Sequence, residues 1–106
     1  MIEITRIKNE QGTNIGFRCL GHAGFARHGK DIVCAGVSAL VINTINSIEE
    51  FTEDKFSCAQ EEKAGLVEFI IVSEVSKESA LLMDALFLGL TNIQHDYGKR
   101  FITVRA

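Results

Sequence analysis

The stretch that decides the fold covers residues 21–40 and reads GHAGFARHGKDIVCAGVSAL. It starts at the end of a predicted strand, continues through a glycine-bearing loop and enters an apolar helix. Asp31 is a good N-cap for that helix, because its carboxylate can accept hydrogen bonds from N–H groups of the first turn. His22 then ends the strand and Cys34 lies in the first helical turn, so an imidazole and a thiol are expected at the same end of one strand–loop–helix unit.

This pairing predicts a cysteine nucleophile. The unpaired N–H groups of a helix N-terminus favour a thiolate and can also hold an oxyanion, and an imidazole can act as base for the thiol. Taken alone, Cys34 is as well explained by a buried structural cysteine, and His22 by a strand end whose nitrogens bind solvent. Their common position favours catalysis. His28, in the middle of the loop, is a rival base.

Two neighbours are candidate supporting residues. Asp31 either caps the helix or orients an imidazole as a third member; capping is the safer interpretation, and its charge would also raise the pKa of Cys34. Ser38 lies one turn after Cys34 on the same helix face. Its hydroxyl can bind the substrate or the thiol, or simply fill a small polar niche.

The loop contains a near match to the phosphate-binding P-loop. Residues 24–30 fit its first seven positions, but Asp31 stands where Ser or Thr should bind magnesium, and a carboxylate there would repel phosphate. We therefore reject nucleotide binding. Gly24 and Gly29 instead predict a mobile loop that closes over a bound peptide, with Phe25 as either a lid residue or an anchor.

A zinc site is the competing use for the thiols. Cys19 and His22 lie three apart on a strand and so point to opposite faces, which makes a shared ion with Cys34 difficult, and no CxxC pair occurs. We expect no metal and no cofactor. Cys58, inside a predicted strand, is expected in the core, and His95, near the end of the second helix, at the surface.

Composition excludes several classes of protein. The 106 residues are 46% hydrophobic and 24% charged, which is typical of one small folded domain. A net charge of −3 argues mildly against nucleic acid as a partner. Three cysteines cannot all pair, and the N-terminus lacks the apolar core of a secretory signal, so a cytoplasmic location with free thiols is expected. The apolar stretch 80–90 is too short to span a membrane.

The remaining pattern predicts the fold. Strands are expected at 1–8, 15–22, 55–62, 66–73 and 100–105, and helices at 32–53 and from a Ser76 cap to about residue 96, where Gly98 is a stop signal. The order ββαββαβ is an α+β fold, a single small domain over residues 1–106 with two helices packed on a mostly antiparallel sheet. The first half of helix 32–53 is apolar nearly all round and is expected to be buried. A second subunit is expected to cover some of the apolar helix surface.

The segment resembles the ribosomal-processing cysteine proteases of bacteria, the Prp family. The matching residues are Gly21-His22-Ala23, a glycine-containing loop, Asp31-Ile32-Val33-Cys34-Ala35 and Val37-Ser38. The resemblance extends over essentially the whole chain. It implies that Cys34 is the nucleophile and His22 the general base. Our further candidates are Gly21, Asp31 and Ser38 as supporting residues and Gly24, Phe25 and Gly29 as the substrate loop.

The resemblance also implies a substrate and an assembly. The family removes a short N-terminal extension from a ribosomal large-subunit protein, is dimeric, and binds an extended peptide with bulky apolar residues before the cut. Two alternatives stay open: a non-catalytic ribosome-associated binding module that keeps this segment for its fold, and another thiol hydrolase or acyltransferase that uses the same pair.

Overall fold

The computed structural model describes residues 1–27 and 29–105, so the rival base His28 lies outside the described residues. The elements in chain order are β1 (Ile2–Lys8), β2 (Asn14–Leu20), α1 (Ile32–Phe51), β3 (Phe56–Glu61), β4 (Leu66–Ile71), α2 (Lys77–Tyr97) and β5 (Ile102–Arg105). The predicted ββαββαβ order is confirmed, and so are both helix caps: Asp31 begins α1, and Ser76 begins α2.

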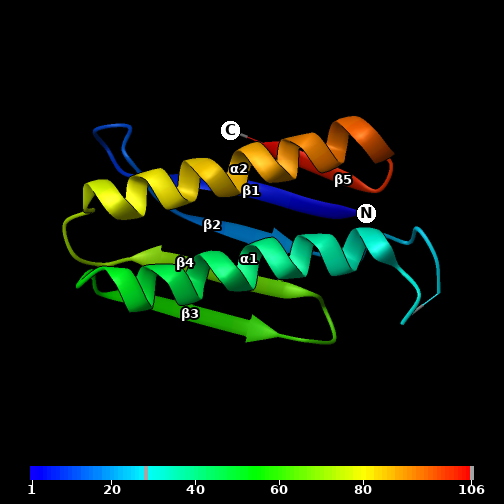
Figure 1. The fold of residues 1–106 in the computed structure, drawn as a ribbon, viewed down its shortest axis with the longest axis horizontal. Coiled ribbons are helices and arrows are strands. Elements are labelled where there is room, and N and C mark those ends of the chain that lie inside the picture. Colours follow the sequence, from blue (N-terminus) through cyan, green and yellow to red (C-terminus); the bar gives the residue numbers. More distant parts are fainter. Residues whose placement is uncertain (28, 106) are drawn as a thin grey trace.

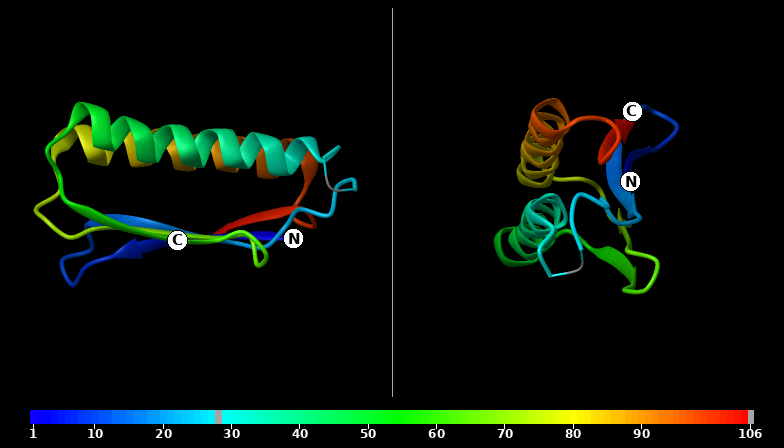
Figure 2. Two further views of the ribbon diagram at one scale, coloured as in Figure 1. Left: turned by 90° about the horizontal axis from the view of Figure 1, so that it is seen from below. Right: turned by 90° about the vertical axis from the view of Figure 1, so that its right-hand side faces the viewer.

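The molecule has two layers. The five strands form one sheet in the order β3-β4-β2-β1-β5, in which β1 and β5 are parallel and the other neighbours antiparallel. The mostly antiparallel sheet is thus confirmed. Both helices lie side by side on one face of this sheet, as Figure 1 and the two turned views of Figure 2 show. In the described part of the chain, the other face of the sheet carries no helix.

Aromatic side chains fill the space between the layers. Phe17 of β2 stacks on Phe69 of β4, with ring centroids 5.3 Å apart, and meets the edge of Phe87 of α2 at 6.3 Å. All three are fully buried. Because β2 and β4 are neighbours in the sheet, this contact joins the two strands and α2 in one core.

Helix α1 is less buried than its composition suggests. Val33, Val37 and Val41 are buried against the sheet, whereas the side chains of Ile32 and Ile42 are 57% and 54% exposed. The expected burial of its first half is therefore only partly right, because a two-layer fold covers one side of a helix. By length and composition alone α1 is apolar enough to cross a membrane, a property that core helices share.

The two remaining predictions differ in outcome. Cys58 is exposed, so its expected place in the core is wrong. The reason is that β3 is an edge strand whose side chains after Phe56 are all exposed. His95 is at the surface, as expected, with its side chain largely exposed.

Candidate active site

Asp31 organises the start of α1. Its Oδ1 accepts hydrogen bonds from the N–H groups of Val33 and Cys34, both at 3.0 Å, and its Oδ2 accepts from the N–H of Phe25 at 3.0 Å. The carboxylate therefore caps the helix and ties the preceding loop to it. Partial burial acts to raise the pKa of Asp31, but these donors outweigh it and hold the pKa below its usual value.

Cys34 occupies the first turn of α1, as predicted, but the pKa of its thiol is shifted in the opposite direction to the one expected. Burial raises the pKa of its thiol and the nearby Asp31 carboxylate adds to the rise, while a hydrogen bond from Ala23 N–H to Sγ at 3.2 Å opposes it. The net effect is an increase. The expectation that the helix N-terminus stabilises a thiolate is therefore wrong for the free protein, which holds a neutral thiol at neutral pH.

The N–H groups expected to hold an oxyanion are also occupied. Val33 and Cys34 donate to the Asp31 side chain, and Ala35 N–H donates to the Asp31 carbonyl at 3.1 Å. The donor that lies against the sulfur is instead Ala23 N–H, from the loop. Sequence reasoning missed this donor because it is a backbone group on the other side of the loop.

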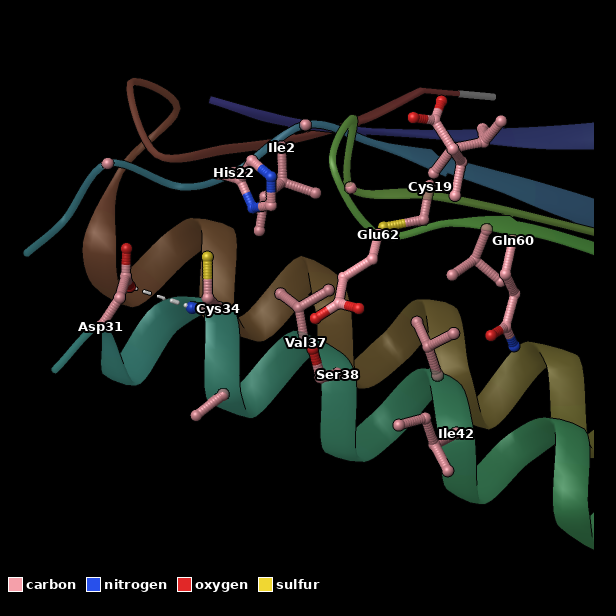
Figure 3. Close-up of a pocket in the computed structure, with 18 of the residues that line it drawn as sticks. Ile2, Cys19, His22, Asp31, Cys34, Val37, Ser38, Ile42, Gln60 and Glu62 are labelled. Atoms are coloured by element: carbon pink, nitrogen blue, oxygen red, sulfur yellow. Dashed lines mark hydrogen bonds between the residues drawn. The ribbon is translucent and has the colours of Figure 1, made fainter. Parts of the chain in front are cut away.

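His22 follows the end of β2, and its side chain lies beside the turn between β3 and β4. Its Nε2 lies 3.2 Å from the carbonyl oxygen of Lys63, in the turn between β3 and β4. No hydrogen bond joins the ring to Cys34 or Asp31, all three of which the structure describes. Figure 3 shows the His22 ring and the Cys34 thiol pointing into the same cavity from opposite sides.

The cavity has a volume of about 620 Å³ and lies between α1 and the β3–β4 hairpin. It collects almost all the predicted site residues, which come from the segment after β2 and from α1 with its cap: Gly21, His22, Gly24, Gly29, Asp31, Cys34 and Ser38. Phe25 is the exception. Its ring packs edge-on against Tyr97 and Phe101, with centroids 5.5 and 5.0 Å apart, so it is an anchor of the loop.

The second wall of the cavity was not predicted. It is formed by the β3–β4 hairpin, which contributes Gln60, Glu61, Glu62, Gly65, Leu66 and Val67. Figure 3 shows Glu62 extending from the turn toward α1 near Ser38. Within residues 1–27 and 29–105, neither Glu61 nor Glu62 has an ion-pair partner. The acidic pair in the sequence was the available signal, but nothing in it indicates that this hairpin faces α1.

The character of the cavity suits a peptide. Valine and leucine side chains of α1 and β4 supply an apolar floor, and the two carboxylates supply negative charge at one side. Cys19 also lines the cavity, but burial and the neighbouring Cys34 raise its pKa to about 11, so it is a neutral thiol. No group of three metal-ligating side chains occurs in the described part of the chain.

Three features of the site define a thiol-dependent hydrolase of peptide-like substrates. They are a neutral thiol on a capped helix, an imidazole across the same cavity and a backbone donor against the sulfur. The family model of the cysteine protease Prp matches residues 1–102. The chain therefore belongs to the Prp family and is a cysteine protease.

Individual relatives agree. The chain is 30% identical over 101 residues to the ribosomal processing cysteine protease Prp of Bacillus subtilis, covering 92% of this chain and 90% of that protein. A crystal structure of the Staphylococcus aureus Prp with a covalently linked product peptide is similar with a TM-score of 0.91 and 26% identity, covering 99% of this chain and 98% of that one. A Streptococcus mutans structure has a TM-score of 0.80 and 32% identity, with 99% and 92% covered.

Proposed function

We propose that this protein is an endopeptidase that removes the N-terminal extension of a bacterial ribosomal large-subunit protein, with Cys34 as nucleophile and His22 as general base. The observation that carries the roles is the convergence of the two side chains on one peptide-sized cavity. The relatives named ribosomal processing proteases support the substrate.

The raised pKa of Cys34 decides how the reaction starts. A neutral thiol needs a base at the moment of attack, so His22 takes the thiol proton as Sγ forms its bond to the scissile carbonyl carbon. The developing oxyanion then accepts a hydrogen bond from the N–H of Ala23, whose nitrogen lies 3.2 Å from Sγ in the free protein.

The intermediate then collapses. The carbon–nitrogen bond breaks, the imidazolium of His22 gives its proton to the departing amine, and Cys34 is left as a thioester. Water attacks the thioester while His22 takes a proton from that water. The acid product leaves and the proton returns to the Cys34 sulfur, so the enzyme regains its starting state.

The cavity supports an extended peptide as substrate. Its apolar floor suits bulky apolar residues, and the hairpin edge beside it offers backbone groups for strand addition. Gly24, Ala26 and Gly29 of the loop border the same space. Phe25 holds this end of the loop against Tyr97 of α2 and Phe101, just before β5.

Mass spectrometry of the host's N-terminally extended large-subunit ribosomal protein tests this proposal. We expect one discrete cut with the unmutated chain and none with Cys34→Ala or His22→Ala. Cys58→Ser is the matched control, because this exposed cysteine lies outside the cavity lining, and it should cleave normally. No cut by the unmutated chain, with the partner folded and bound, would favour the binding module instead.

We also propose a homodimer in the cytoplasm. Leu81 and Leu88 lie on one side of α2 with side chains 69% and 65% exposed, an apolar surface that a second copy would cover. The three cysteines are all free, which suits a reducing compartment. Sedimentation should give a dimer, and Leu88→Glu should shift it toward monomer; a monomer at all concentrations contradicts the assembly. Fractionation of host cells tests the location.

A further inference from the structure

The turn between β3 and β4 is bonded to the end of β2 that carries His22. Gly21 N–H lies 3.2 Å from the carbonyl oxygens of both Ala64 and Gly65, and the Lys63 carbonyl lies 3.2 Å from His22 Nε2. Three consecutive backbone carbonyls of one turn therefore face two consecutive residues of the strand end. The ring contact links residues 41 positions apart, and together these bonds hold the ring of the proposed base and the backbone of the residue before it.

Gly65 makes this approach possible. Its φ is +64°, a left-handed conformation that side-chain-bearing residues rarely adopt. A Cβ built at this position would lie 2.4 Å from the Gly21 carbonyl oxygen and 3.1 Å from Cε1 of His22. Any other residue would therefore have to push the turn away from His22, which would lengthen the bond between Nε2 and Lys63.

A carbonyl partner sets the protonation pattern of the ring. A carbonyl oxygen only accepts, so Nε2 must carry the proton and donate it to Lys63. In neutral imidazole the other nitrogen, Nδ1, is then an unprotonated acceptor. Nδ1 has no hydrogen-bond partner among the described residues, so it is the nitrogen free to take the proton of Cys34.

Among the described residues, no carboxylate, the usual group that orients a catalytic histidine, is hydrogen-bonded to this ring. Asp31, the carboxylate nearest in sequence to Cys34, uses its oxygens on the helix cap and on Phe25 N–H. Within the described residues the Lys63 carbonyl is the one acceptor bonded to the imidazole. It would also accept from the imidazolium formed in the reaction and so stabilise that charge.

We propose that the main-chain carbonyl of Lys63 is the third, positioning member of the His22–Cys34 pair, and that Gly65 is the residue that holds it in place. The proposal rests on the function proposed above. It makes Nδ1 the base and the β3–β4 turn a part of the catalytic apparatus, although no side chain of that turn touches the reacting atoms.

Nitrogen-15 NMR of the histidine rings in the unmutated full chain tests the first half, with His22→Gln to assign the signals. We expect His22 to be protonated at Nε2 and unprotonated at Nδ1 when neutral. A neutral ring protonated at Nδ1 would overturn the proposal, and this outcome needs no substrate to be cleaved.

Gly65→Ala tests the second half. We expect kcat/KM for the extension peptide to fall roughly ten- to a hundredfold, mostly in kcat, by analogy with the loss of groups that orient metal-bound histidines. The Nε2–H signature should be lost in the same variant. Gly12→Ala is the matched control, because Gly12 has a φ of +81° but open space around its Cβ position; it should keep wild-type activity and tautomer.

The outcomes separate the two proposals. A folded Gly65→Ala chain with unchanged kcat/KM and unchanged tautomer refutes the positioning role while leaving the protease function intact. If Gly65→Ala does not fold, Gly65→Asn replaces it, because Asn tolerates the left-handed conformation but still brings a Cβ. If Cys34→Ala still cleaves, the proposed function fails, and the NMR result on His22 stands by itself.

Discussion

At the scale of single residues, Asp31 has two opposing effects on the site. It accepts three backbone hydrogen bonds, which fix the start of α1 and the loop before it. Its negative charge also raises the pKa of the adjacent Cys34 thiol. Together with burial, this charge favours the protonated thiol, which is why the proposed mechanism needs His22 as a base.

Asp31→Asn should separate these effects. Asparagine is still a good N-cap, but it removes the charge, so the pKa of Cys34 should fall and the thiol should react faster at neutral pH. Iodoacetamide labelling of Cys34 across a pH series from about 6 to 10 measures this. The series uses a Cys58→Ser background, because Cys58 is exposed.

Asp84→Asn, on an exposed position of α2, is the control and should leave the labelling curve of Cys34 unchanged. A labelling curve of Asp31→Asn that coincides with the parent, or moves to higher pH, would show that the carboxylate does not raise the pKa of the thiol.

At the scale of elements, the β3–β4 hairpin completes a site whose motif lies entirely on other elements. It contributes one wall of the cavity, two carboxylates without an ion-pair partner among the described residues, and the carbonyl bonded to His22. A second set of hydrogen bonds between distant segments joins the end of one helix to the start of the other. Asp54, after α1, accepts from Ser76 N–H at 3.0 Å and from Ser76 Oγ at 2.8 Å at the start of α2.

The acidic wall should select for charge in the substrate. Replacing both carboxylates, as Glu61→Gln with Glu62→Gln, should lower kcat/KM roughly two- to fivefold for peptides with a lysine beside the cut, the size expected of a solvent-exposed ion pair. Peptides with glutamine at that position should be cleaved as before. Cleavage assays at low and high salt check this, with Glu10→Gln as control; equal effects on both peptides would contradict it.

Asp54 should make stability depend on pH. Burial acts to raise its pKa, but its hydrogen-bond donors, Ser76 among them, lower it below the usual 3.8. Its contribution is then complete above the pKa of the unfolded chain and is lost as pH falls through the lower folded value. Asp54→Asn should cost about 1 kcal/mol of unfolding free energy at pH 7.

The destabilisation caused by Asp54→Asn should vanish at pH values below the folded-state pKa of Asp54. Denaturant unfolding at a series of pH values measures it, and Glu53→Gln, an exposed neighbour, should show no such difference. A cost for Asp54→Asn that is the same in acid and at neutral pH would show that the charge of the carboxylate is not responsible.

At the scale of the whole molecule, two layers explain both the core and the unpredicted exposure. One face of the sheet meets the helices, and the aromatic contacts of Phe17, Phe69 and Phe87 lie between them. Each helix consequently keeps an outer side, which carries exposed leucine and isoleucine side chains. We therefore expect the residues that contribute most to the free energy of unfolding to lie under β2 and β4, close to the end of β2 that precedes His22.

Phe17→Leu tests this concentration. Removing a ring that contacts two other rings should lower the free energy of unfolding by about 1–3 kcal/mol. Phe51→Leu, at the exposed end of α1, should change it by less than about 0.5 kcal/mol. Urea unfolding measures both, and equal effects at the two positions would contradict a core centred on β2 and β4.

The features that could be predicted from the sequence are the local ones. The element order, both helix caps, the place of Cys34 in the first helical turn and the place of His22 at a strand end all depend on neighbours within a few residues, and hydrophobic periodicity and capping chemistry report such neighbours directly. The family resemblance of residues 21–40 depends on the same short range.

The neighbours of residues 21–40 in space depend on the tertiary structure. The pairing of β4 with β2 brings the Lys63 carbonyl and Gly65 to His22, and the position of β3 at the edge leaves Cys58 exposed. Burial and charge at Cys34 reverse the expected pKa direction for the same reason. Strand order depends on packing between segments distant in the chain, and a local pattern carries no record of which distant segment becomes its neighbour.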